Sequence, residues 1–188
     1  MQTITLTNVL PHVFAARTDL KSEVWQQDVK FEKNKLYLVE AMSGTGKSTL
    51  CSYILGYRHD YTGKVMFDAT DTKSISVSEW VNIRQRSISH LFQELRLFPE
   101  LTALENVMIK NNLTNFKPVD EIKDWFERLG IGDKLNAKVG RMSFGQQQRV
   151  AMMRALVQPF DFILADEPIS HLDDTNSAII CLLYTSDA

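Results

Sequence analysis

Residues 41–48 read Ala41-Met42-Ser43-Gly44-Thr45-Gly46-Lys47-Ser48, and this stretch decides the fold. A short apolar run, residues 36–39, precedes it, and a segment with the apolar spacing of a helix face, residues 49–55, follows it. We therefore expect a strand buried on both faces, then a loop, then a helix that Gly56 ends.

The loop is close to the G-x-x-x-x-G-K-[ST] pattern of phosphate loops. Gly44 and Gly46 would let backbone N–H groups turn inward around phosphate oxygens, and the helix start would point its positive end at the anion. Lys47 would reach the β- and γ-phosphates, and Ser48 would offer its hydroxyl to Mg²⁺. Ala41 stands where the pattern has its first glycine. The alternative is an ordinary flexible loop before a helix.

The rest of the chain alternates between strand and helix patterns. Strands are expected at residues 4–9, 29–31, 65–67, 87–92 and 160–165. Between about 100 and 142 the pattern is helical, and residues 118–130 form its clearest case, with an opening proline, early acids and a final glycine. Its expected apolar face is Val119, Ile122, Trp125, Phe126 and Leu129. A further helix begins near Ser143, so the order predicts a parallel α/β core with a helical insertion.

Two carboxylates, Asp166 and Glu167, follow the apolar strand that ends at Ala165. Ligands bind at the carboxyl ends of strands in open parallel sheets, and an acid there can hold Mg²⁺ beside a phosphate loop. A second acid can orient or deprotonate the attacking water. Taken alone, the pair also fits a solvated loop start.

Composition describes an ordinary globular chain of 188 residues, 44% hydrophobic and 23% charged. The formal net charge of −2 indicates no general nucleic-acid surface, so no nucleic-acid partner is expected. Two cysteines are too few for a disulfide framework. We see no signal peptide, and the longest apolar run, residues 178–184, is too short to span a membrane.

Four further segments occur in a specific order. Residues 92–107 resemble the glutamine loop of ATP-binding-cassette (ABC) ATPases, and residues 142–151 resemble their signature motif, LSGGQ. Residues 166–168 match the end of their Walker B strand, and residues 170–173 resemble their D-loop. The resemblance covers roughly Ile4 to Ile180 and is far more specific as an ordered set than any single motif.

The resemblance implies a single ABC nucleotide-binding domain with a RecA-like P-loop NTPase core, an N-terminal antiparallel β part and an inserted helical subdomain. The core would be about 1–92 and 142–188, and the subdomain about 93–141. It also implies ATP and Mg²⁺ as cofactors, ATP hydrolysis, a head-to-tail dimer with a second ATPase subunit, and a transmembrane permease as partner. The protein would then be cytoplasmic and peripheral on the inner face of the membrane.

Site roles carry over from the family by position. The phosphate-binding residues would be Ala41, Met42, Ser43, Gly44, Thr45, Gly46, Lys47, Ser48 and Thr49. Ser48, Gln93 and Asp166 would attend Mg²⁺, and Glu167 would be the general base, with Lys47 and Gln93 also serving catalysis.

The opposite subunit would be met by the signature and the D-loop. Ser143, Gly145 and Gln146 would contact a γ-phosphate across the dimer interface, and Asp173 would contact the other subunit. For Ser143 alone, an ordinary capped helix is the other interpretation. Phe144 replaces the first signature glycine, so its side chain must point away from the phosphate.

The aromatic residue that stacks on adenine normally lies upstream, in the β part of the family fold. Phe14 is the candidate, although Trp25 and Tyr37 are also aromatic and any of the three fits a core position.

The sequences of residues 98–107, 146–149 and 164–168 are similar to those of the lipoprotein-release and macrolide-export branch of the family. The spacing from Lys47 to Ser143 is too short for the long coiled coil of chromosome-maintenance relatives. Two alternatives stay open: a non-transport ATPase of the cell-division type, and a nucleotide-binding module without turnover.

The last residues, Cys181 to Ala188, resemble a translated sequencing adapter, and no histidine follows His171. We therefore expect a cassette that lacks its C-terminal part and the family's switch histidine. A genuine short helix is the alternative.

Overall fold

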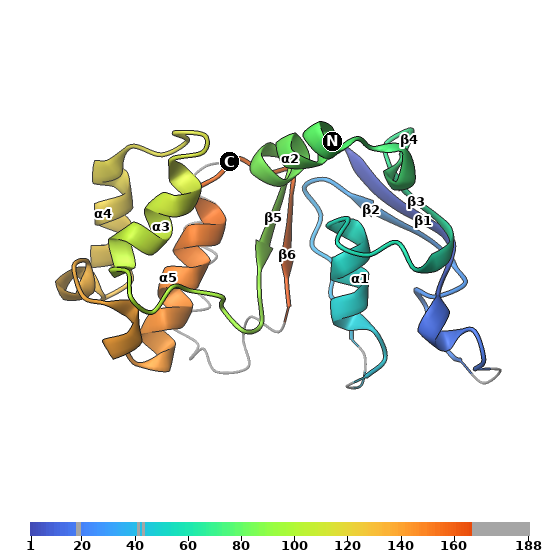
Figure 1. Cartoon of the computed structure of the whole chain (residues 1–188), viewed down its shortest axis with the longest axis horizontal. Helices are drawn as coiled ribbons and strands as arrows, with labels where there is room; N and C mark the ends of the chain where they lie inside the picture. The colour runs from blue at the N-terminus through green and yellow to red at the C-terminus, as the bar shows by residue number, and fades with distance from the viewer. Residues whose placement is uncertain (18–19, 41, 43, 167–188) are drawn as a thin grey trace. The chain divides into compact units, whose positions relative to one another are not determined.

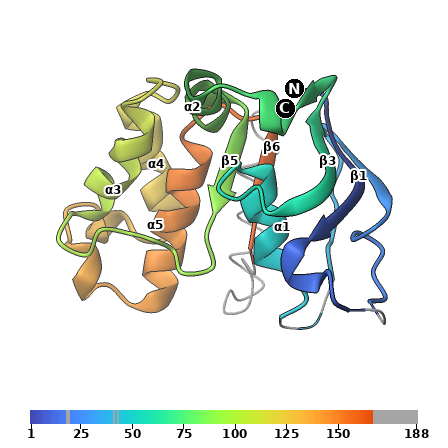
Figure 2. The ribbon, with the colours of Figure 1, turned by 45° about the vertical axis from the view of Figure 1, so that its right-hand side comes forward.

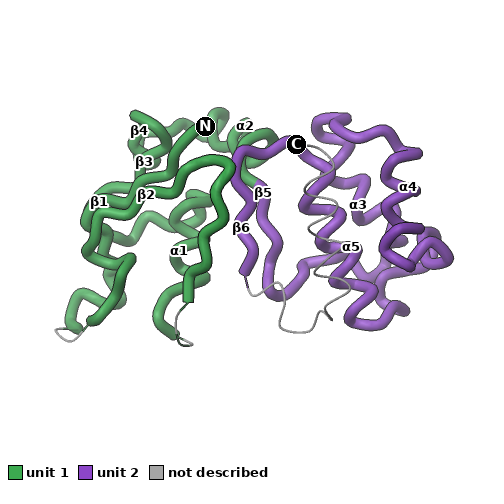
Figure 3. Tube along the Cα trace, turned by 180° about the vertical axis from the view of Figure 1, so that it is seen from behind, with its two compact units in different colours: residues 1–88 green, residues 89–188 purple. Residues whose placement is uncertain are grey.

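The computed structural model describes residues 1–17, 20–40, 42 and 44–166. The chain divides into two compact units, residues 1–88 and 89–188 (Figure 3). This division differs from the core and subdomain boundaries that the resemblance implies, which stay a prediction.

The first unit is built on a four-stranded antiparallel sheet (Figure 1). Its order is β2 (Asp28–Glu32), β1 (Thr3–Pro11), β3 (Tyr61–Phe67) and β4 (Thr70–Asp71). Ile4 and Leu6 of β1 are buried on one face, which is the alternation expected for a half-buried strand. The sequence-based strands at residues 4–9, 29–31 and 65–67 and the antiparallel β part are confirmed.

A bulge bends β1 where its pairing with β3 shifts between Thr7 and Leu10. Asn8 has a φ of 49° there, and Gly63 on β3 has a φ of 79°. A Cβ on Gly63 would lie 2.3 Å from the carbonyl oxygen of Asn8. Glycine is therefore required for the two backbones to approach this closely.

Helix α1 (Lys47–Ile54) confirms the predicted helix and buries Leu50, Tyr53 and Ile54. Helix α2 (Val77–Arg86) was not expected, because it buries only Trp80 and its apolar residues Val77 and Val81 are exposed, so the segment shows no apolar face. Its signal is the capping box of Ser76 and Glu79, in which each residue bonds the backbone N–H of the other. The described residues also form four single-turn 3₁₀ helices: η1 (His12–Phe14), η2 (Thr72–Ser74), η3 (Gly132–Lys134) and η4 (Val139–Arg141).

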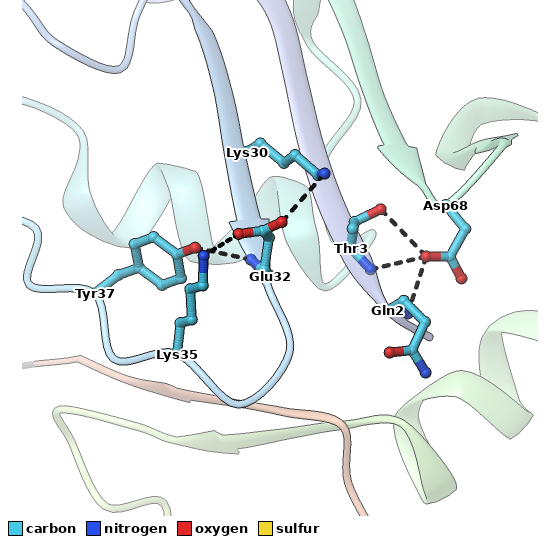
Figure 4. Close-up of polar contacts among 7 residues, drawn as sticks. All are labelled: Gln2, Thr3, Lys30, Glu32, Lys35, Tyr37 and Asp68. Carbon is cyan, nitrogen blue, oxygen red and sulfur yellow. Dashed lines mark hydrogen bonds and ion pairs between the residues drawn. The ribbon is translucent and has the colours of Figure 1, made fainter.

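Local polar contacts fix the start and the edge of this sheet (Figure 4). Asp68 accepts hydrogen bonds from the backbone N–H groups of Gln2 and Thr3 at 2.9 and 2.7 Å. Burial opposes the charged form of Asp68, but these bonds outweigh it and lower the pKa. The N-terminus is thereby tied to the turn after β3.

The expected strand at residues 36–39 is wrong, because this segment lies in no strand of the described chain. Leu36 is 99% exposed and Leu38 is 81% exposed. An apolar run supplies side chains for two faces, but it does not supply the neighbouring strands that must accept its backbone hydrogen bonds. Tyr37 packs back against β2: its hydroxyl accepts from the Glu32 N–H at 3.0 Å, and its ring meets Phe31 edge-on.

The second unit packs α3 (Ala103–Asn111), α4 (Val119–Arg128) and α5 (Phe144–Leu156) around an apolar core (Figure 2). The α4 prediction is confirmed for Ile122, Trp125, Phe126 and Leu129, which are buried. It is wrong for Val119, which is 42% exposed because it lies at the first turn, before the helix reaches the core.

Two short strands, β5 (Ile88–Leu91) and β6 (Phe162–Ala165), pair in a second sheet. They confirm the strands expected at residues 87–92 and 160–165. Among the described helices, none has the length and apolar character needed to span a bilayer.

Candidate functional site

The phosphate loop turns through two glycines in the left-handed region. Gly44 has a φ of 77° and Gly46 a φ of 101°, and Gly46 is the N-cap residue of α1. A Cβ on Gly44 would meet nothing within 4 Å, so the backbone is open to a ligand there. Lys47 and Ser48 then form the first turn of the helix. This is the geometry that lets backbone N–H groups and a helix start face an anion.

Polar contacts tighten this loop from within. Thr45 donates from its backbone N–H to the Met42 carbonyl at 3.3 Å, and from its hydroxyl to the same oxygen at 2.6 Å. Ala41 and Ser43 lie outside the described residues, so their predicted roles stay predictions.

Aromatic rings support the phosphate loop. The Trp25 indole N–H donates to the Thr45 carbonyl at 3.0 Å, and Phe14 packs beside Trp25 with ring centroids 6.4 Å apart. Phe14 is 4% exposed and Trp25 is 5% exposed, whereas Tyr37 is 40% exposed. Adenine stacking by Phe14 stays a prediction, and the ring has little free surface for it in this structure.

The glutamine loop leaves β5 through two consecutive non-glycine residues in the left-handed region. Leu95 has a φ of 56° and Arg96 a φ of 49°. Arg154, on α5, donates to both of their carbonyls, at 2.6 Å to Leu95 and 2.8 Å to Arg96. Burial lowers the pKa of Arg154. The sequence carries no local signal for this contact, because Arg154 lies far along the chain from Leu95 and Arg96 and neither of those two residues is a turn-former.

Register brings Gln93 and Asp166 to one end of the second sheet. The Asp166 N–H donates to the Leu91 carbonyl at 3.1 Å, and Gln93 follows Leu91 by two residues. Two of the three side chains expected to attend Mg²⁺ are thus placed at the same strand ends. Glu167, Asp173, His171 and residues 181–188 lie outside the described part of the chain.

His90 precedes this end of β5, and its two ring nitrogens are buried without a hydrogen-bond partner among the described residues. Burial lowers its pKa to about 4; Arg96 and Lys110 push the same way, and Asp166 opposes them. The imidazole is therefore neutral near pH 7. A role for His90 was not predicted from the sequence.

The signature segment forms the start of α5, and side chains cap this helix start. Ser143 accepts from the Gln146 N–H at 3.4 Å, and Gln146 accepts in return from the Ser143 N–H at 3.0 Å, which completes a capping box. A Cβ on Gly145 would meet nothing within 4 Å. Phe144 is 51% exposed. The helix start therefore has open space at the glycine, as a phosphate contact would need.

Comparison with known proteins assigns the segment that contains these loops to one family. The family described as "ABC transporter" matches residues 26–170. The chain is 35% identical to the ABC transporter ATP-binding protein YclH of Bacillus subtilis, over 87% of this chain and 74% of that protein. It is 40% identical to the lipoprotein-releasing system ATP-binding protein LolD of Aquifex aeolicus, over 78% of this chain and 66% of that protein.

The fold has a close counterpart among solved structures. The dimeric structure of MJ0796, a bacterial ABC transporter cassette, superposes with a TM-score of 0.72 at 28% identity, over 96% of this chain and 81% of that one. A post-hydrolysis structure of the same cassette, bound to ADP and Pi, gives a TM-score of 0.70. The RecA-like cassette fold predicted from the motifs is confirmed, and the chain belongs to the ABC transporter family as an ATP-binding ATPase subunit.

Proposed function

We propose that two copies of this chain bind MgATP head to tail and hydrolyse it to drive a separate transmembrane permease, in lipoprotein release or a related export. The relatives that are lipoprotein-releasing system ATP-binding proteins favour this branch, and the dimeric MJ0796 cassette favours the pairing. The protein would then work on the inner face of the cytoplasmic membrane, through its permease.

The observation that carries nucleotide binding is the phosphate loop itself. Two left-handed glycines, Gly44 and Gly46, lead directly into the first turn of α1, where Lys47 and Ser48 stand. A loop of this shape places several N–H groups and a lysine around one anion.

The residues present also fit Mg²⁺. Hydroxyl, amide and carboxylate oxygens, here those of Ser48, Gln93 and Asp166, are the hard ligands that Mg²⁺ prefers. Gln93 and Asp166 share one end of the β5–β6 sheet. The bound ion would neutralise phosphate charge, while Lys47 holds the phosphates and Glu167 accepts the proton of the attacking water.

Phosphate release from purified protein at saturating MgATP tests turnover. We expect Lys47→Ala to lose nucleotide binding, and Glu167→Gln to keep binding while turnover falls by about 100-fold or more. Full hydrolysis by Glu167→Gln would show that Glu167 is not the base. Binding without any release by the parent protein would instead favour the nucleotide-binding module without turnover.

Capture of the membrane partner separates the two remaining functions. A permease of an export system, recovered with the parent protein, would support transport. A membrane protein that controls a cell-wall hydrolase, recovered in its place, would support the cell-division type.

A further inference from the structure

Trp25 contacts the phosphate loop at the peptide unit that joins Thr45 to Gly46, the N-cap residue of α1. Its indole N–H donates to the Thr45 carbonyl at 3.0 Å, and this carbonyl belongs to the Thr45–Gly46 peptide. The described chain contains no cis peptide bond, so the N–H of Gly46 points away from the Thr45 carbonyl. Fixing the carbonyl toward Trp25 therefore fixes the Gly46 N–H on the opposite side, away from the indole.

The Trp25 ring is held rigidly enough to impose this orientation. The Ser22 hydroxyl accepts from the Trp25 backbone N–H at 2.9 Å. Tyr53, on α1, meets the indole edge-on with ring centroids 6.1 Å apart, and the indole is 5% exposed. Helix α1, which begins at the phosphate loop, thus also carries the Tyr53 ring that packs against Trp25.

Close packing makes the contact specific to glycine. A Cβ on Gly46 would lie 3.1 Å from ring carbons of both Trp25 and Phe14. The two rings therefore lie against the Gly46 backbone, and they leave the other side of the peptide for a ligand.

We propose that Trp25 is a positioning residue for phosphate binding: its indole N–H holds the Thr45–Gly46 peptide so that the Gly46 N–H faces the bound phosphate. The role is distinct from stacking on adenine, because it acts through the backbone of the loop. It rests on the proposed function, since it assumes that phosphates lie against this loop.

Trp25→Phe removes the N–H and keeps an aromatic ring, and Trp80→Phe is the matched control. Trp80 is a second buried tryptophan of the same unit, 6% exposed and packed edge-on against Phe67. We measure dissociation constants by calorimetry for MgATP and for magnesium tripolyphosphate, which has no base. We expect Trp25→Phe to weaken both ligands by about threefold to tenfold, as the loss of one hydrogen bond predicts, and Trp80→Phe to weaken neither.

Two outcomes overturn the inference. Equal affinities for Trp25→Phe and Trp80→Phe would show that the N–H does not matter, and a loss confined to MgATP would show that the ring acts on the base. Failure of the parent protein to bind either ligand would instead count against the proposed function.

A second pair of measurements guards against a folding defect. Replacing Trp25 by its benzothienyl isostere, in which sulfur takes the place of the N–H, keeps the ring shape and should reproduce the loss at an unchanged unfolding temperature. In the Trp80→Phe/Trp125→Phe variant Trp25 is the sole tryptophan, and its emission should respond to tripolyphosphate and not to adenosine. An emission that responds to adenosine alone would contradict the role.

Discussion

The phosphate loop and the glutamine loop both depend on left-handed backbone, but they reach it by opposite means. In the phosphate loop the residues are Gly44 and Gly46, for which positive φ carries no Cβ penalty. In the glutamine loop they are Leu95 and Arg96, each of which costs about 1–2 kcal/mol in that conformation. Arg154 offsets that cost with two charged hydrogen bonds.

The difference follows from what each loop presents. A phosphate is met by backbone N–H groups, so the residues there must be small and the support must come from behind, from Trp25 and Phe14. The glutamine loop presents a side chain, Gln93, and can afford bulky neighbours if another helix holds their carbonyls.

Gly46→Ala tests whether the phosphate loop needs a glycine packed against Trp25 and Phe14, and it should have the largest effect. A φ of 101° is strained for alanine, and the new Cβ would press on Trp25 and Phe14. Strain and crowding together should cost about 3 kcal/mol, and MgATP binding should fall by roughly 100-fold. Calorimetric titration with MgATP measures the loss.

Gly130→Ala is the control for strain without crowding. Gly130 also has positive φ, 65°, but a Cβ there would meet nothing within 4 Å. We expect about 1 kcal/mol of lost stability and unchanged nucleotide affinity. Equal nucleotide affinity in Gly46→Ala and Gly130→Ala would refute the supporting role of the rings.

Arg154→Met tests whether Arg154 stabilises the left-handed residues of the glutamine loop. Two carbonyls lose their charged donors, and two strained residues lose the contact that holds them, so the unit should lose about 2–3 kcal/mol. Chemical denaturation measures the loss, and limited proteolysis near Leu95 should become faster. Arg149→Met, on the same helix but with one longer bond of 3.3 Å to the Leu129 carbonyl, should cost less.

A rescue experiment tests the cause. In the Arg154→Met background, Arg96→Gly should recover about 1 kcal/mol, because glycine accepts the left-handed conformation without strain. Failure of the rescue would mean that Arg154 acts through packing alone.

The pH dependence of stability also distinguishes the two loops, by a smaller effect. The rings of Phe14 and Trp25 do not titrate, whereas the strand before the glutamine loop carries the partly buried His90, whose pKa is about 4 in the folded state against 6.5 for a solvent-exposed imidazole. Between these values the unfolded chain binds more protons, so stability falls as pH falls from 6.5 to about 4. The loss should be about 1–2 kcal/mol, discounted for partial burial. His90→Phe should flatten this slope in denaturation curves, and a slope that persists would assign it to another group.

Sequence reasoning succeeded where local pattern and tertiary need agree. Helix α4 has a proline start, early acids and a strong apolar face, and α5 begins at the Ser143 cap as expected. It failed where pattern is incomplete: residues 36–39 are apolar but have no strand partner, and α2 shows only a capping box. The phosphate-loop motif predicted the site, but the contacts of Trp25 and Arg154 join distant segments and leave no periodic trace.

The exposed segment at residues 36–39 has a consequence for handling the protein. Leu36 and Leu38 present branched apolar side chains to solvent on a backbone with no strand partner in the described chain. Such a segment is a template for pairing with its own copy in another molecule. In concentrated solution, self-association should therefore begin through this segment. Leu36→Lys should raise the protein concentration at which light scattering begins to increase.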